Sequence, residues 1–169
     1  MTKSEKKESY FNYRVGGIII KNGKILLHSD PHVEFWVVPG GSAKPFEASD
    51  KAVIREFQEE IGLSVTVERL LFIIENSFEF SNTKFHGLEL MFLVTPNDTT
   101  KILEQEEFIG IETDHGDDYY GEGDLTLTYR WFAPSELDSI VIEPQVLKEA
   151  LKNIPNHPVL LRNLEIDYD

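Results

Sequence analysis

Cysteine is missing from this sequence of 169 residues. Its absence excludes disulfide bonds, thiolate metal sites and cysteine nucleophiles, and it agrees with a reducing compartment such as the cytoplasm. Long apolar runs are missing as well. Because a membrane-spanning helix needs about 18 or more apolar residues in succession, we expect none. Residues 1–9 are polar, without an apolar stretch behind their basic positions, so we expect a flexible tail and no targeting signal.

Basic side chains are few. Lys and Arg number 16 against 30 Asp and Glu, which gives a formal net charge of -14. Since affinity for nucleic acids comes largely from basic side chains that neutralise phosphates, we expect no nucleic-acid partner. A polyphosphate substrate would also be repelled unless cations lay between it and the protein. The charge balance therefore indicates metal ions at any site that binds phosphates.

The length of the chain and its hydrophobic content of 41% predict one compact domain over residues 10–169. Apolar periodicity predicts strands, a helix, further strands and a second helix, with no internal repeat. This order differs from the regular strand–helix alternation of a doubly wound parallel sheet. It favours an α/β (α+β) fold in which helices flank a mixed β-sheet.

Turn and helix signals set the bounds of the predicted elements. The pair Asn22-Gly23 favours a tight hairpin turn between two antiparallel strands, and residues 39–41 would end a third strand. Helical spacing begins near Glu47 and stops at Gly62, and Pro144 suits the first position of a second helix. The predicted strands cover residues 13–20, 24–28, 35–38, 64–75, 88–95, 108–111 and 126–133, and the second helix covers residues 144–153.

The first predicted helix carries a cluster of carboxylates. At 100° per residue, Glu56, Glu59 and Glu60 fall on one side of the helix with Arg55, and the apolar residues form a separate face. Such glutamates repel one another by about 0.2–0.5 kcal/mol per exposed pair. A divalent cation would remove that repulsion, since carboxylate oxygens suit magnesium and manganese. On its own, the cluster is also typical of a solvated acidic face.

The segment around this cluster decides between the two interpretations. Residues 41–63 read GSAKPFEASDKAVIREFQEEIGL, which resembles the signature box of the Nudix hydrolases at every defined position. The probability of a chance match in a chain of this length is on the order of one in ten million. The similarity extends over about residues 12–155 and implies a mixed β-sheet sandwiched between α-helices. The matching positions are Gly41, Glu47, Arg55, Glu56, Phe57, Glu59, Glu60, Gly62 and Leu63.

The resemblance implies a divalent-metal-dependent hydrolase that cleaves a phosphoanhydride bond with metal-activated water. Glu56, Glu59 and Glu60 would bind Mg²⁺ or Mn²⁺ together with the carbonyl of Gly40. Arg55 would hold the glutamates in position through charge-assisted hydrogen bonds. Of the remaining box residues, Glu47 would stabilise the loop–helix junction, Gly41 would permit the sharp turn, and Gly62 would end the helix.

The general base that takes a proton from the attacking water is less defined. We predict Glu59, and Glu112 in the long acidic stretch after Pro96 is its main competitor. Most acids of that stretch are expected to be solvated surface residues. They are Glu104, Glu106, Glu107, Glu112, Asp114, Asp117, Asp118, Glu122 and Asp124.

The substrate is left open among three hypotheses. The first is a nucleoside diphosphate linked to another moiety, the second is a nucleoside triphosphate, including oxidised forms, and the third is a nucleotide-sensing domain without turnover. We prefer catalysis because no box glutamate is lost. A monomer and a homodimer both remain open. Ordinary surface, core or loop packing is the favoured interpretation for each of the residues that could contact the substrate. The candidates for phosphates are Arg14, His28, Lys44 and Arg130, and those for stacking on a base are Phe35, Phe78, Phe80, Tyr119 and Tyr120.

Overall fold

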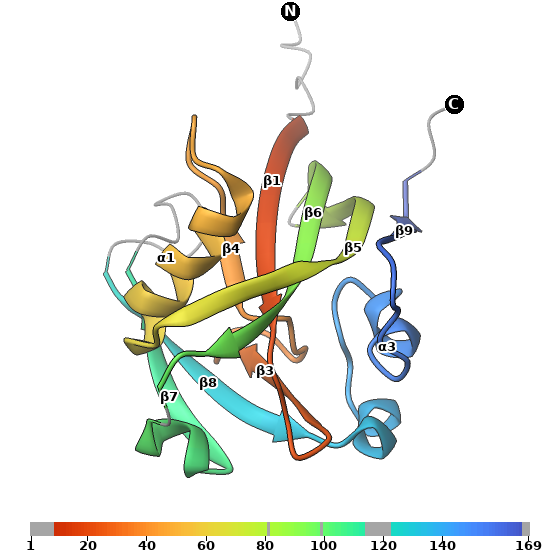
Figure 1. The fold of residues 1–169 in the computed structure, drawn as a ribbon. Coiled ribbons are helices and arrows are strands. Elements are labelled where there is room, and N and C mark those ends of the chain that lie inside the picture. The colour runs from red at the N-terminus through yellow and green to blue at the C-terminus, as the bar shows by residue number, and fades with distance from the viewer. Residues whose placement is uncertain (1–8, 81, 99, 114–122, 167–169) are drawn as a thin grey trace, which may run out of the picture.

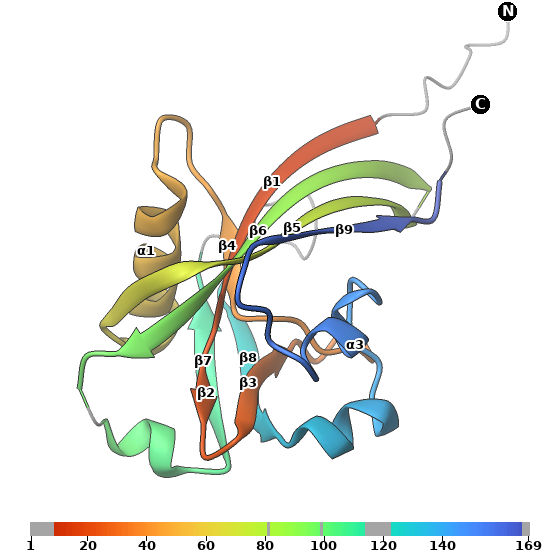
Figure 2. The ribbon, with the colours of Figure 1, turned by 45° about the vertical axis from the view of Figure 1, so that its right-hand side comes forward.

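Two β-sheets lie across each other in the described chain (Figure 1, Figure 2). The computed structural model describes residues 9–80, 82–98, 100–113 and 123–166. The first sheet is mixed and has the strand order β4-β1-β6-β5-β9, whereas the second is antiparallel with the order β2-β3-β8-β7. The mixed α+β class is confirmed, with the strands divided between two sheets.

The elements have the following bounds. The strands are β1 (Ser9–Ile18), β2 (Ile20–Lys21), β3 (Lys24–Ser29), β4 (Gly40–Ser42), β5 (Val65–Phe80), β6 (Thr83–Pro96), β7 (Glu107–Glu112), β8 (Leu125–Phe132) and β9 (Val159–Leu164). The helices are α1 (Ser49–Ile61), the 3₁₀ turns η1 (Lys101–Glu104) and η2 (Pro134–Ser139), and α3 (Leu147–Ala150).

The prediction of one continuous strand over residues 13–20 is wrong. The chain leaves the first sheet after β1, which pairs in parallel with β6, and only the short β2 pairs with β3 in the second sheet. Ile18 and Ile19 are both buried, so consecutive side chains face the core as the chain crosses between the sheets. The hairpin turn itself is confirmed, since Asn22 and Gly23 have φ values of 52° and 75°.

Residues 35–38 do not form the predicted strand. Trp36 and Val37 make only isolated bridges, to Ile142 and His28, and the actual strand β4 begins at Gly40, where the strand was predicted to end. Gly40 has a φ of 152°, and a Cβ there would collide with the carbonyl oxygen of Val15 on β1. The glycines therefore permit close strand pairing here.

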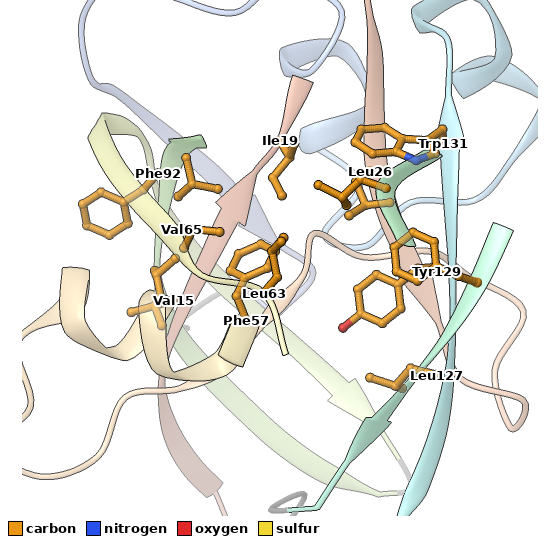
Figure 3. Packing of buried hydrophobic residues seen from close by; sticks show 14 of the residues in the cluster. Val15, Ile19, Leu26, Phe57, Leu63, Val65, Phe92, Leu127, Tyr129 and Trp131 are labelled. Carbon is orange, nitrogen blue, oxygen red and sulfur yellow. The ribbon is translucent and has the colours of Figure 1, made fainter. Parts of the chain in front are cut away.

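The helix α1 starts two residues after Glu47 and ends as predicted at Gly62. Gly62 has a φ of 64° and donates its N–H to the carbonyl of Gln58 at 3.1 Å. The helix contacts β1, β4 and β5 of the first sheet and β7 of the second. Phe57 inserts between the sheets in one core cluster, together with Val15, Leu63 and Tyr129 (Figure 3).

The second predicted helix is much shorter than residues 144–153, because α3 has only four residues. After it, the backbone N–H groups of Lys152 and Asn153 bond to carbonyls three residues earlier, so the segment closes in tight turns. The buried Leu147 and Leu151 still pack in a second core cluster. Strand β9 was not predicted, since its apolar residues do not alternate along this partly exposed edge strand.

The β5–β6 hairpin extends beyond both predicted strands, and this extension lines a cavity discussed below. Strands β7 and β8 lie where residues 108–111 and 126–133 were predicted, to within two residues. Residues 1–8 of the predicted tail lie outside the described residues, and residue 9 begins β1. Among the described residues, no helix combines the length and apolar character needed to cross a membrane.

Candidate active site

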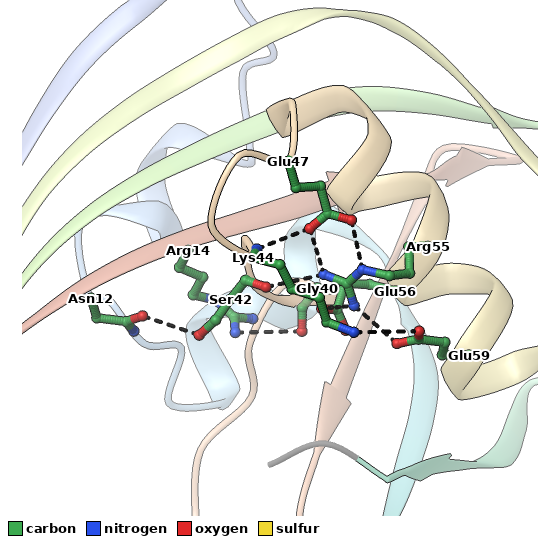
Figure 4. Close-up of polar contacts among 9 residues, drawn as sticks. All are labelled: Asn12, Arg14, Gly40, Ser42, Lys44, Glu47, Arg55, Glu56 and Glu59. Atoms are coloured by element: carbon green, nitrogen blue, oxygen red, sulfur yellow. Dashed lines mark hydrogen bonds and ion pairs between the residues drawn. The ribbon is translucent and has the colours of Figure 1, made fainter. Parts of the chain in front are cut away.

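Arg55 ties the loop between β4 and α1 to the helix (Figure 4). Its Nε and Nη2 donate to the two carboxylate oxygens of Glu47 at 2.7 and 2.9 Å. Its Nη1 donates to Glu56 at 2.7 Å and to Glu59 at 2.9 Å. Nη2 also donates to the carbonyl of Ser42 at 3.1 Å. We call Arg55, Glu47 and Glu59 the Arg55 network.

The charges of the Arg55 network stabilise one another. The hydrogen bond from Arg55 lowers the pKa of Glu47 to about 2, and the backbone N–H of Lys44 adds to this by donating to Glu47 at 2.9 Å. The same bond to Glu47 raises the pKa of Arg55 above its ordinary value. Glu59 lies on the outer side, where its side chain is 38% exposed and its carboxylate is 3.9 Å from the Lys44 ammonium.

A second group of carboxylates lies beneath the helix. Glu56, Glu60 and Glu112 each offer an oxygen, and these oxygens lie within 4.8 Å of one another. Glu112 is the last residue of β7, a strand in contact with α1, so sheet pairing brings it to the helix from 52 or more positions away in the chain. We call these three residues the buried carboxylate cluster. The sequence prediction had included Glu112 only as a competitor for the general base.

Burial raises the pKa of Glu60 well above its ordinary value, and the neighbouring Glu112 raises it further. Burial also raises the pKa of Glu56, although the charge of Arg55 opposes this effect. The hydroxyl of Tyr129 donates to Oε2 of Glu60, whereas Oε1 of Glu60 is buried without a hydrogen-bond partner. The cluster thus concentrates negative charge that the described protein atoms neutralise only in part.

These residues fit a hard divalent cation. Carboxylate oxygens are the ligands that Mg²⁺ and Mn²⁺ prefer. Oε1 of Glu60 accepts no hydrogen bond and could coordinate such an ion. Gly41 leaves room for the cluster, because a Cβ at this position would lie 2.6 Å from the carboxylate carbon of Glu56. The carbonyl of Gly40, the other predicted ligand, accepts a long hydrogen bond of 3.4 Å from Arg14.

The structure therefore divides the predicted site residues. Glu56, Glu60 and Glu112 come together, and Arg55 contacts Glu56 and Glu59 of the three glutamates that it was expected to hold. Its contact with Glu47 was not predicted. Glu59 is not part of the buried group, so its roles as ligand and base stay predictions. Of the loop acids, Glu106 pairs with Lys24 at 3.2 Å. Asp114, Asp117, Asp118 and Glu122 lie outside the described residues, as do Tyr119 and Tyr120.

Tyr129 was not recognised from the sequence as part of the site. Its ring stacks between His28 and Phe108, with centroid distances of 5.2 Å to each, and its hydroxyl reaches Glu60. The available signal was its alternation in phase with Leu125 and Leu127, which are also buried. Burial lowers the pKa of His28 to about 3, so this imidazole is neutral near pH 7.

Two cavities adjoin the site. One has a volume of about 230 Å³ and is lined by residues that include His28, Gly40 and Glu112. The other has a volume of about 330 Å³ and extends under the β5–β6 hairpin. Both are lined by Arg14, Phe35 and Val37. The two cavities therefore lie on either side of these three residues.

Sequence comparison with known proteins identifies relatives of this chain. Diphosphoinositol polyphosphate phosphohydrolase 2 of Mus musculus is 30% identical over 89 residues, which are 52% of this chain and 50% of that protein. CTP pyrophosphohydrolase of Escherichia coli (strain K12) is 39% identical over 57 residues, which are 31% of this chain and 42% of that protein. The matched region spans at most half the length of either relative.

Solved structures agree in fold. A structure described as UDP-X diphosphatase superimposes with a TM-score of 0.56 at 18% identity, covering 89% of this chain and 64% of that chain. At this identity the likeness shows the fold alone. The family model of the NUDIX domain matches residues 11–154, which include the whole box, the buried carboxylate cluster and α3. On this match the chain belongs to the NUDIX domain family.

Proposed function

We propose that the protein is a divalent-metal-dependent hydrolase that cleaves a phosphoanhydride bond in a nucleotide. The observation that carries this proposal is the buried carboxylate cluster, whose oxygens lie within 4.8 Å of one another beside an open cavity. Such a concentration of buried negative charge destabilises a metal-free protein and favours a bound cation. The relatives named above are a phosphohydrolase and a pyrophosphohydrolase, which supports the same class of reaction.

Glu56, Glu60 and Glu112 would hold Mg²⁺ or Mn²⁺, with the Gly40 carbonyl as a further ligand. The ion supplies neutralisation of the phosphate charge and a lower pKa for a bound water. Tyr129 would act as a positioning residue, because its hydroxyl donates a hydrogen bond to Oε2 of Glu60 and so orients this carboxylate. Arg55 holds the carboxylate of Glu56 from the opposite side at 2.7 Å.

We assign the general base to Glu59. The three carboxylates of the buried cluster would be committed to the cation, whereas Glu59 is exposed enough for water to reach it. Its hydrogen bond from Arg55, at 2.9 Å, fixes its orientation on the helix. A base in this position takes a proton from water that attacks phosphorus and leaves no covalent intermediate on the enzyme.

For the substrate we propose a nucleoside diphosphate linked to another moiety. Two neighbouring cavities that share three lining residues suit a diphosphate with groups extending from it. A nucleoside triphosphate is the second candidate, supported by the similarity to CTP pyrophosphohydrolase across the box region. The second cavity is lined by several glutamates, which disfavours a polyphosphorylated ring such as that named for the mouse relative.

A screen of nucleoside diphosphate conjugates and nucleoside triphosphates with Mg²⁺ or Mn²⁺ tests the proposal, with products separated by mass spectrometry. Release of a nucleoside monophosphate and a phosphorylated moiety supports the first substrate class, and release of pyrophosphate supports the second. Nucleotide binding without turnover at either metal would indicate a sensor. In line with the sequence, a cytoplasmic location is proposed, and the choice between monomer and homodimer stays open to measurement.

A further inference from the structure

A row of polar side chains crosses the first sheet where the second cavity lies. Arg14 on β1 is directly opposite Glu89 on β6, and Asn76 on β5 is directly opposite Asn163 on β9. Asn76 and Glu89 are diagonal neighbours across the β5–β6 pair, because Ile74 is opposite Glu89 and Asn76 is opposite Gly87. Glu89, Asn76 and Asn163 are at most 8% exposed. We call these four residues the polar row.

The hydrogen bonds of the polar row leave one oxygen, Oε2 of Glu89, without a donor. Asn163 donates to Oδ1 of Asn76 at 3.0 Å, and Nδ2 of Asn76 donates to Oε1 of Glu89 at 2.7 Å. Oε2 of Glu89 is buried and accepts no hydrogen bond. Its nearest cationic atom, Nε of Arg14, lies at 4.0 Å, and Arg14 uses Nη2 to donate to the carbonyl of Val38 at 2.7 Å. Glu89, a lining residue of the cavity, thus has one carboxylate oxygen that accepts no hydrogen bond.

The rest of the cavity limits what can meet this oxygen. Its volume of about 330 Å³ lies in the range of small-molecule sites, and Phe35, Phe78 and Pro144 give it flat apolar surface. Glu143 and Glu165 add negative charge at the same cavity, and burial together with Glu165 raises the pKa of Glu143. A flat, uncharged group that donates hydrogen bonds from one edge fits these apolar and acidic walls.

From these contacts we infer that the second cavity binds the nucleobase of the substrate and selects bases that carry an exocyclic amino group. The amino N–H groups of cytosine, adenine or guanine would donate to Oε2 of Glu89. Uracil would instead place a keto oxygen against the carboxylate, and hypoxanthine would place a C–H group where guanine carries its amino group. This inference rests on the proposed function for the position of the phosphates, which would lie in the adjoining cavity.

The test compares pairs of nucleotides that differ at the amino group. In the wild-type protein with Mg²⁺, kcat/KM should be at least about tenfold higher for CTP than for UTP and for GTP than for ITP. The same preference should appear in calorimetric binding of CMP over UMP and of GMP over IMP. The binding measurement does not require turnover and therefore tests the cavity independently of the catalytic site.

Glu89→Gln sharpens the test because the two side chains have the same shape. The amide oxygen of Gln is needed as the acceptor for Asn76, so its NH₂ group would face the cavity and favour a keto oxygen. We expect the CTP to UTP ratio to fall by at least about tenfold, with the thermal unfolding midpoint confirming a folded variant. Glu68→Gln, which removes an exposed carboxylate on the same strand as Asn76, is the matched control and should keep the wild-type ratio.

The outcomes separate the two proposals. Turnover of both members of each pair within twofold, or an unchanged ratio in Glu89→Gln, would overturn the inference and leave the proposed function standing. Preferential binding of CMP and GMP without hydrolysis of any nucleotide would support the inference and overturn the proposed function. If Glu89→Gln does not fold, the wild-type pairs alone decide.

Discussion

Glutamate side chains on the two sides of helix α1 lie in opposite electrostatic environments. On the outer side, Glu47 and Glu59 are bound by Arg55, and the pKa of Glu47 falls to about 2. On the inner side, Glu56 and Glu60 meet Glu112 in the buried carboxylate cluster, and burial raises the pKa of both helix glutamates. Glu59 and Glu60 are adjacent in the chain, yet they belong to different environments.

This difference shows which carboxylates are already satisfied by the protein. The Arg55 network contains its own cation, so it stabilises the loop–helix junction without a metal. The buried cluster has access to Arg55 only through Glu56 and leaves Oε1 of Glu60 without a partner. An added cation should therefore bind more favourably to the buried carboxylate cluster than to the Arg55 network. The following predictions test that division, from the largest expected effect to the smallest.

The largest effect is expected from Glu60→Gln, compared with Glu59→Gln at the next position. Both variants should lower kcat by at least about a hundredfold, the first through loss of a metal ligand and the second through loss of the base. Only Glu60→Gln should abolish the rise in thermal unfolding midpoint that Mg²⁺ produces in the wild type. Retention of that Mg²⁺ response in Glu60→Gln, or its loss in Glu59→Gln, would contradict the division.

Arg55→Ala should lower the free energy of unfolding by about 2 kcal/mol, because three carboxylates lose charge-assisted hydrogen bonds. Urea denaturation in the presence of EDTA measures this without a metal contribution. Arg55→Lys should recover less than half of the loss, since an ammonium cannot reproduce the paired bonds to Glu47.

Lys152→Ala is the matched control for Arg55. Lys152 also bridges two carboxylates, Asp138 at 2.6 Å and Glu149 at 2.7 Å, but its partners are 69% and 78% exposed. We expect a much smaller loss in the free energy of unfolding than in Arg55→Ala, because solvent screens exposed ion pairs. An equal loss in the two alanine variants would show that burial does not strengthen the Arg55 network.

Tyr129→Phe should weaken Mg²⁺ binding and lower kcat/KM by about tenfold, because Glu60 loses the hydroxyl that orients it. The ring and its stacking on Phe108 and His28 are retained. Titration of Mg²⁺ followed by thermal unfolding measures the change in affinity. Tyr10→Phe, at the exposed end of β1, should leave the affinity as it is. An unaltered Mg²⁺ affinity in Tyr129→Phe would remove its positioning role.

The smallest effect concerns pH. Glu56 and Glu60 have raised pKa values in the folded protein, so the folded state binds more protons than the unfolded state above their ordinary pKa of 4.5. Stability present below that pH is therefore lost as the pH rises through the raised values. Without metal, the unfolding midpoint of the wild type should therefore fall as the pH rises above 4.5, for example from pH 6 to pH 8.

Two comparisons serve as controls for this pH dependence, one in the buried carboxylate cluster and one in the Arg55 network. Glu60→Gln should show a smaller loss between pH 6 and pH 8, and Mg²⁺ should stabilise the wild type more at pH 8 than at pH 6. Glu47 has the opposite sign, because its pKa of about 2 means that its stabilisation is present above pH 4.5 and is lost as the pH falls toward 2. A wild-type midpoint that rises from pH 6 to pH 8 without metal would refute the assignment.

Local patterns were sufficient for much of this protein. The box spacing predicted α1 and its end at Gly62, and the family resemblance implied the contacts of Arg55 with Glu56 and Glu59. These features depend on residues within about 20 positions of one another, where helical periodicity and backbone preferences act directly. The helical wheel, however, placed Glu56, Glu59 and Glu60 on one charged face. Helical spacing alone could not predict that other parts of the chain bury Glu56 and Glu60 but leave Glu59 exposed.

Tertiary structure decided which carboxylates are buried and what accompanies them. Pairing of β7 with β8 delivers Glu112 and Tyr129 to the inner side of α1. The polar row also exists only because four strands from distant parts of the chain align side by side. The sequence by itself determined the family and the chemistry of the box, since both reside in local spacing. The composition of the buried carboxylate cluster and of the polar row depended on long-range strand register, which no local pattern encodes.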